Sequence, residues 1–202
     1  MFLQALAAPP GARAVPRAKH NQHFRLVRLL QIGGLLVASG PLFATVEEAA
    51  EVSRLHRSGS SVEAVQLADK ILATRPKDAQ MRFLKGVVLA ESQRAAEAVE
   101  VFQGLTEDFP ELAEPYNNLA ALHAGRGDYE RARVALEQAL RSNPGYATAH
   151  ENLGDVHGML ASRAYARALT LDPSNERLPG KLALVRELFS AKRAPATPAK
   201  PQ

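Results

Sequence analysis

Residues 113–146 read AEPYNNLAALHAGRGDYERARVALEQALRSNPGY, and this stretch predicts two antiparallel helices joined by a short turn. Apolar residues recur at helical spacing on both sides of residues 125–128, where two glycines and a capping aspartate suit a turn. Pro144 cannot continue the second helix and therefore ends it. The small side chains of Ala120 and Ala132 let the two helices approach closely, so a larger residue there would overpack the contact.

The same pattern recurs along the chain every 34 residues. The closing prolines keep this interval, and so do alanines in the second helix: Pro76, Pro110 and Pro144, with Ala64, Ala98 and Ala132. Counting back from them places unit one at residues 45–78, unit two at 79–112 and unit three at 113–146. The period predicts stacked helix pairs, each burying its apolar face against its neighbours.

In unit three the chain resembles the tetratricopeptide repeat family. The residues that match the pattern of that family are Tyr116, Leu119, Ala120, His123, Ala132, Leu136, Ala139 and Pro144. Units two and one match less closely, and Arg82 replaces the expected aromatic residue in unit two. Across residues 45–175 the resemblance implies an all-α fold, a right-handed α-solenoid of helix-turn-helix repeats, with protein binding along its concave face.

The fourth unit, residues 147–175, is shorter than the others. It runs from Ala147 to Pro173, and five residues are missing from the place where the turn should lie. Apolar residues continue one helical face across the join, so we predict a single long helix from about Thr148 to Leu171, bent, if anywhere, at Gly158.

A capping helix is expected at residues 176–192. Pro179 and Gly180 precede KLALVRELFSAK, in which four apolar residues are expected on one face: Leu182, Val185, Leu188 and Phe189. The remaining residues, 193–202, are rich in proline and alanine and are expected to be disordered.

Residues 1–44 have the layout of an export signal: five basic residues, no acid, and then the uncharged run 29–44 ending at Ala44. That run has 16 residues, whereas a membrane-spanning helix needs about 20, so an uncleaved anchor is the alternative. The long basic region leaves open a true start downstream of Met1. We expect a periplasmic protein, or one anchored in the inner membrane and facing the periplasm.

Composition excludes several kinds of chemistry. Outside the leader 20 basic residues face 21 acidic ones, so the pI of 9.6 does not indicate a nucleic-acid partner. The absence of cysteine excludes disulfides, thiol catalysis and a lipidated cysteine. His123, His150 and His157 stand where the family packs aromatic rings, and no catalytic or metal-binding motif is present. We expect no enzyme, cofactor or small-molecule substrate.

The groove is the expected binding site, because in this family the first helix of each unit lines the concave face. The positions concerned hold Gln80, Phe83, Val87 and Glu91 in unit two, Glu114, Asn117, Asn118, Ala121 and Ala124 in unit three, and Thr148, Glu151, Asn152 and Asp155 in unit four. Asn118 and Asn152 occupy the same position, where a carboxamide can pair with a peptide backbone. Four acids and no base among these residues predict a neutral or basic partner.

The resulting hypothesis is a non-catalytic protein-interaction scaffold or adaptor of the bacterial cell envelope, binding a peptide or helix in its groove. Two alternatives stay open. One is a dedicated accessory subunit of an envelope enzyme, for example in wall synthesis or cytochrome assembly. The other is a scaffold tethered to the membrane by an uncleaved leader. The oligomeric state and the identity of the partner are not determined by the sequence.

Overall fold

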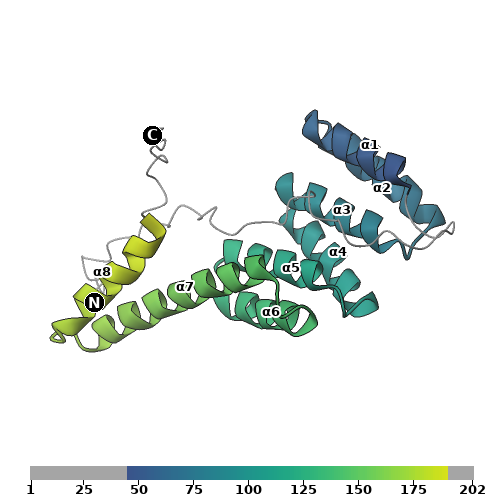
Figure 1. Cartoon of the computed structure of the whole chain (residues 1–202). Coiled ribbons are helices and arrows are strands. Elements are labelled where there is room, and N and C mark those ends of the chain that lie inside the picture. Colours follow the sequence, from purple (N-terminus) through teal and green to yellow (C-terminus); the bar gives the residue numbers. More distant parts are fainter. Residues whose placement is uncertain (1–44, 191–202) are drawn as a thin grey trace, which may run out of the picture.

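The fold was taken from a computed structural model, which describes residues 45–190. Within this range the chain forms eight helices and no strand (Figure 1). They are α1 (Val46–Arg57), α2 (Ser61–Thr74), α3 (Ala79–Glu91), α4 (Ala95–Asp108), α5 (Ala113–Gly125), α6 (Tyr129–Ser142), α7 (Ala147–Leu171) and α8 (Arg177–Ser190). The all-α prediction is confirmed. The predicted leader (1–44), the end of the predicted capping helix and the predicted tail lie outside the described residues.

Helices α1 to α6 form three pairs that stack one after another, and α7 runs out from this stack (Figure 1). Each pair closes around small or apolar residues of its second helix at matching register positions. Ala64, Ala98 and Ala132 are all fully buried. One core cluster spans α1 to α4 and includes Leu119 and Leu122 of α5, and a second spans α5 to α7. The two clusters therefore meet at α5.

The turn inside each pair has one residue in the left-handed region. These residues are Gly59 with a φ of 88°, Gln93 with a φ of 62° and Gly127 with a φ of 78°. They stand at equivalent positions of units one, two and three. Glycine adopts this conformation without steric cost, whereas Gln93 adopts it at a cost. The turn geometry thus repeats with the same interval as the sequence.

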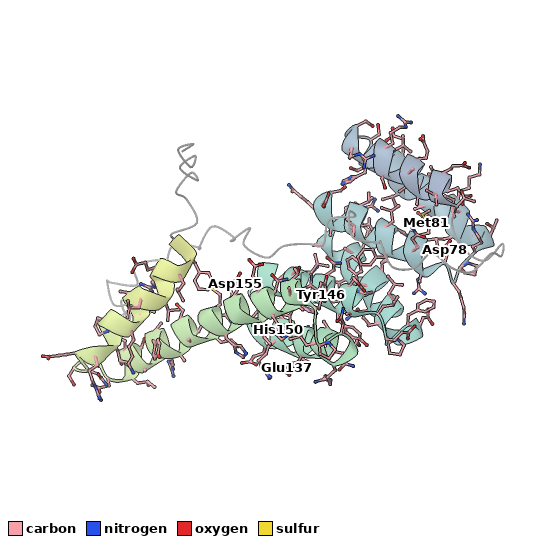
Figure 2. All side chains as sticks on the ribbon, in the orientation of Figure 1. Asp78, Met81, Glu137, Tyr146, His150 and Asp155 are labelled. Atoms are coloured by element: carbon pink, nitrogen blue, oxygen red, sulfur yellow. The ribbon has the colours of Figure 1, made fainter. Side chains whose placement is uncertain are left out.

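Side-chain caps are present at the starts of α1, α3 and α6. Asp128 accepts a hydrogen bond from the Arg131 backbone N–H at 3.3 Å, which confirms its predicted role as the N-cap of α6. At the start of α3, the buried Asp78 accepts one from the Met81 N–H at 2.9 Å (Figure 2). Each cap satisfies one of the backbone donors that a helix leaves unpaired at its first turn.

Helix α7 is a single helix of 25 residues, as the missing turn predicts. Its first half packs on α5 and α6 and buries Ala149, Asn152 and Val156. Its second half carries Tyr165 and Ala168. The residues at the equivalent positions of the first three units are fully or nearly fully buried, whereas Tyr165 and Ala168 are only half-buried in the fourth unit. The second half therefore has no complete helix pair of its own.

Helix α8 folds back along the second half of α7. It begins at Arg177, with Pro179 in its first turn, where proline is tolerated. Leu182 is 7% exposed, and the ring of Phe189 lies so close to Gly158 that a Cβ added there would come within 2.7 Å of it. Its contacts are chiefly with α7.

One residue of α8 differs from the prediction. Leu188 was expected on the same face as Leu182, but its side chain is 71% exposed. Six residues of helix rotate a side chain by about 240°, which turns Leu188 away from the buried face.

Candidate peptide-binding groove

The predicted groove residues lie on α3, on α5 and on the first half of α7, and their exposure divides them into two sets. The buried set consists of Phe83, Val87, Asn117, Asn118, Ala121, Ala124 and Asn152. The half-buried or exposed set consists of Gln80, Glu91, Glu114, Thr148, Glu151 and Asp155. The second set is the more accessible one, and four of its six members are acids.

Two apolar members of the buried set, Phe83 and Val87, belong to the core cluster that spans α1 to α4. Phe83 is 7% exposed, and its ring centroid lies 5.6 Å from that of Phe102 at a tilt of 59°. Val87 is 1% exposed. Both side chains pack α3 against its neighbours.

The asparagines link neighbouring repeats. Asn152 Nδ2 on α7 donates to Asn117 Oδ1 on α5 at 2.8 Å, and both side chains are buried. Asn118 Nδ2 donates to the Glu114 backbone carbonyl at 3.1 Å, within its own helix. The structure thus brings Asn152 together with Asn117. Asn117 Nδ2 is buried with no hydrogen-bond partner in the structure, which leaves one donor beneath this face unsatisfied.

Glu91 takes part in a link between the first and second repeats that the sequence analysis missed. His56 Nε2 lies 2.7 Å from Glu91 Oε2, and His56 Nδ1 lies 2.9 Å from Ser61 Oγ. Histidine and glutamate stand 35 residues apart, close to one repeat length, and that spacing is the signal that could have found the pair. The link fixes one acid at the edge of the predicted groove.

The remaining acids follow α5 and α7. Burial, together with the negative charge of Glu114, raises the pKa of Tyr146, whose hydroxyl is buried with no hydrogen-bond partner in the structure. In Figure 2, Asp155 of α7 and Glu137 of α6 lie on opposite edges of this part of the molecule. Glu151 stands one turn before Asp155 and is exposed. Acidic side chains therefore stand at the predicted groove positions of three successive repeats.

A surface hollow that the sequence analysis did not identify lies between α4 and α6. Its volume is about 620 Å³, and it is lined by Gln103, Thr106, Glu107, Tyr116, Leu119, His123, Glu130, Arg131, Arg133, Val134, Ala135 and Gln138. The α5 residues Tyr116, Leu119 and His123 share one helical face, which is the signal for this hollow. Burial lowers the pKa of His123. Its lining mixes both charges and selects no class of ligand.

The three predicted packing histidines have different surroundings. His123 is half-buried, as expected, whereas His150 and His157 are exposed. His150 Nε2 lies 2.9 Å from the Pro144 carbonyl oxygen. His157 is exposed because no second helix of its own unit packs over that part of α7. Among residues 45–190 no three metal-binding side chains form a group, and no helix there is long and apolar enough to cross a membrane.

Comparisons with known proteins agree with this architecture. Residues 50–113 match a tetratricopeptide repeat model, and residues 125–160 match a TPR repeat model. The chain is 28% identical over 135 residues to the chloroplastic tetratricopeptide repeat domain-containing protein PYG7 of Arabidopsis thaliana, covering 63% of this chain and 40% of that protein. It spans less than half the length of the curated relatives it matches.

Two solved structures show the same fold. A thermophilic TPR protein of Thermus thermophilus has a TM-score of 0.51 and 22% identity, covering 71% of this chain and 81% of that one. The first TPR domain of Spaghetti (RPAP3), bound to the HSP90 peptide SRMEEVD, has a TM-score of 0.54 and 15% identity. The match covers 60% of this chain and 99% of that one. Repeats of this kind form scaffolds for protein–protein interaction. The chain belongs to the tetratricopeptide repeat family.

Proposed function

We propose that this chain is a non-catalytic adaptor of the bacterial cell envelope and that its groove binds a neutral or basic peptide or helix. The observation that carries the proposal is the charge of the accessible groove residues. Glu91, Glu114, Glu151 and Asp155 are acidic, whereas the other two accessible members, Gln80 and Thr148, are neutral.

The spacing of these acids suits an elongated partner. Glu114 stands on α5, whereas Glu151 and Asp155 stand one turn apart on α7, the first helix of the following repeat. A partner with lysines or arginines at intervals can place a cation near each acid. Complementary charge accelerates encounter and disfavours acidic competitors, and salt weakens the effect.

The partner proposed here differs in charge from the peptide in the RPAP3 domain. The peptide SRMEEVD carries three acidic residues. An acidic peptide placed against Glu114, Glu151 and Asp155 would bring like charges together, which opposes binding. The shared fold therefore supports a peptide partner as a class, while the local charges favour one of neutral or opposite charge.

The envelope location rests on the sequence of residues 1–44. Mass measurement of the protein purified from its native host tests it. Removal of these residues supports export with cleavage at Ala44, and a retained leader in the membrane fraction supports the anchored form. A retained leader in the cytosolic fraction contradicts the envelope location.

Binding is best tested by reversing charge on the accessible acids. We expect Glu151→Lys combined with Asp155→Lys to lower capture of the native partner from envelope extract by at least about tenfold, which corresponds to about 1.4 kcal/mol. Glu100→Lys on the exposed surface of α4 is the matched control and should leave capture unchanged. Equal capture by all three proteins contradicts the groove proposal.

The same experiment separates the two kinds of adaptor. One enzyme captured in stoichiometric amount indicates a dedicated accessory subunit, whereas several weakly held proteins indicate a general scaffold. Asn152→Ala is a poorer probe than the acids, because it removes the buried hydrogen bond to Asn117 and so weakens the contact between repeats.

A further inference from the structure

The end of α8 lies against the middle of α7, close to two acids of the predicted groove. Helix α8 runs back from the end of α7 toward the stack (Figure 1). The ring of Phe189, one residue before the end of α8, lies where a Cβ added at Gly158 would come within 2.7 Å of it. Gly158 stands three residues after Asp155 and seven after Glu151, and residues at these spacings share one side of a helix. Along α7 the contact with α8 is therefore about 4.5 Å from Asp155 and about 10.5 Å from Glu151.

The residues that follow α8 have the opposite charge to these acids. Residues 191–202, AKRAPATPAKPQ, are called the basic segment because they contain no acid and three bases, Lys192, Arg193 and Lys200. Proline stands at every third position, at Pro195, Pro198 and Pro201. Proline holds φ at about −65°, which reduces the backbone freedom that a peptide loses on binding. The basic segment thus has the composition of the partner that the groove is proposed to bind.

The first two cations of the basic segment are within reach of the acids on α7. Lys192 and Arg193 stand two and three residues after Ser190, the last residue of α8, so their Cα atoms lie within about 7 and 10 Å of it. These lengths match the distances along α7 from the end of α8 to Asp155 and Glu151. The long side chains of lysine and arginine extend the reach further.

The third cation can reach the neighbouring repeat. Lys200 stands ten residues after Ser190, so its Cα can lie up to about 35 Å away. Helix α5 contacts α7, and packed helices stand about 8–10 Å apart, so Glu114 on α5 is within this range. The basic residues of 1–44 precede α1, the first helix of the stack, whereas the basic segment begins beside the acids themselves.

We propose that the basic segment occupies the acidic groove of its own chain and competes there with the partner. This inference rests on the proposed function, because it places the partner at the same acids. The first two cations face Asp155 and Glu151 on α7, and Lys200 faces Glu114 on α5. A partner must displace the segment before it binds, so weakly binding peptides of the same charge are kept out of the groove.

A segment attached to its own binding site competes strongly even when its intrinsic affinity is low. A short flexible attachment gives an effective concentration in the millimolar range. With an effective concentration of about 1 mM and an intrinsic Kd of about 0.1 mM, the segment raises the apparent Kd of the partner about tenfold. Reversing the charge of the segment should remove this competition.

Occupancy of the groove is tested by paramagnetic broadening of nuclear magnetic resonance signals. The chain has no cysteine, so Ala199→Cys carries a nitroxide label at a single thiol. We expect this label to broaden the amide signals of residues 148–155 on α7 and 114–118 on α5, and to leave those of α2 unchanged. The charge-reversed variant should recover the broadened signals; it combines Lys192→Glu, Arg193→Glu and Lys200→Glu.

Two results overturn the proposed occupancy. One is the absence of broadening in α5 and α7. The other is equal broadening when the nitroxide and the ¹⁵N label are on separate chains, because the occupant is then the segment of another copy. A label at Phe2→Cys that broadens these signals while Ala199→Cys does not would assign the groove to residues 1–44 instead.

Capture of the native partner tests the competition. Relative to the parent chain, the charge-reversed variant should lower the apparent Kd of the partner about tenfold. A charge-preserving variant is the matched control and should behave like the parent; it combines Lys192→Arg, Arg193→Lys and Lys200→Arg. Equal capture by the parent and the charge-reversed variant overturns the competition.

The same measurement keeps this inference apart from the proposed function. If Glu151→Lys with Asp155→Lys lowers capture while the charge-reversed variant matches the parent, the groove binds the partner and the competition is wrong. If the groove variant leaves capture unchanged, the proposed function is wrong and the competition fails with it. Occupancy of the groove by the basic segment is still decided by the broadening of the α7 signals.

Discussion

Gly86 and Gly154 hold the same position in the second and fourth repeats, yet their surroundings are opposite. A Cβ at Gly86 would lie 2.7 Å from the ring of Phe102, whereas a Cβ at Gly154 would have nothing within 4 Å. The register places a small residue at both sites. In the second repeat a turn brings the next helix back over it, and in the fourth the chain continues straight. The repeat pattern thus places a small residue at this position, but a side chain packs closely over it only where a turn brings the second helix back.

Restoring the turn should produce the largest change. Inserting GRGDY, copied from residues 125–129, between Gly158 and Met159 gives the fourth unit its full register. We expect the second half of α7 to fold back over Gly154 and form a fourth helix pair. The chain has no tryptophan, so Tyr165→Trp provides a single fluorescent probe of this rearrangement.

The expected signal is a shift of tryptophan emission to shorter wavelength and protection from acrylamide quenching, both measured against Tyr165→Trp without the insertion. Five inserted alanines are the control, because alanine extends the helix without making a turn. Equal quenching in all three proteins would show that the missing turn is not what keeps α7 straight.

Removing an aromatic ring at equivalent positions of the two repeats should have the next largest effect. Phe102→Ala removes a fully buried side chain and should lower the free energy of unfolding by about 3–5 kcal/mol. Tyr165→Ala removes a half-buried side chain and should cost about 1 kcal/mol. Urea titration followed by circular dichroism measures both. Similar losses would mean that the end of α7 is as well packed as the middle of the stack.

The two glycines should respond to substitution with opposite signs. Gly86→Val places methyl groups against the Phe102 ring and should destabilise the protein by about 1–3 kcal/mol. Gly154→Ala adds a methyl group into open space on a helix and should stabilise it by about 0.5–1 kcal/mol. Thermal unfolding compares the two. A stabilising Gly86→Val would remove the contrast between the two sites.

The smallest expected effect is at the turn of the second repeat. Gln93 has a φ of 62°, where glycine stands in the first and third repeats, so Gln93→Gly should stabilise the protein by about 0.5 kcal/mol. The reverse change, Gly59→Gln, should destabilise the protein by about 1 kcal/mol. A Cβ at position 59 has no heavy atom within 4 Å, so the whole cost comes from the left-handed backbone conformation. If both variants unfold like the parent protein, the conformation of these turns carries no measurable strain.

The repeat architecture could be predicted because each local signal agreed with the next. The alanines predicted the close contacts between helices, Asp128 predicted the start of α6, and the five missing residues predicted that α7 is a single helix. The position of Leu188 could not be assigned as reliably, because α8 carries apolar residues around most of its circumference. A helix of that kind has no unique buried face in its sequence pattern.

The groove was less predictable than the fold. The register identified which residues stand on the first helix of each repeat, but not how deeply neighbouring helices bury them. Phe83 and Asn152 occupy accessible positions in the pattern and are buried in the structure, because adjacent repeats pack closely around them. The link between His56 and Glu91 joins two repeats, and a pattern defined within one repeat does not contain it.

The unbroken course of α7 has a mechanical consequence. At 1.5 Å of rise per residue, Asp155 at its predicted groove position and Tyr165 in the second half of α7 lie about 15 Å apart along one straight helix. No turn between them can absorb a change of direction. A force that tilts α8 therefore rotates α7 as a rigid helix about the point where the buried Val156 anchors it in the core. The acids at the predicted groove positions of α7 and helix α8 therefore cannot move independently.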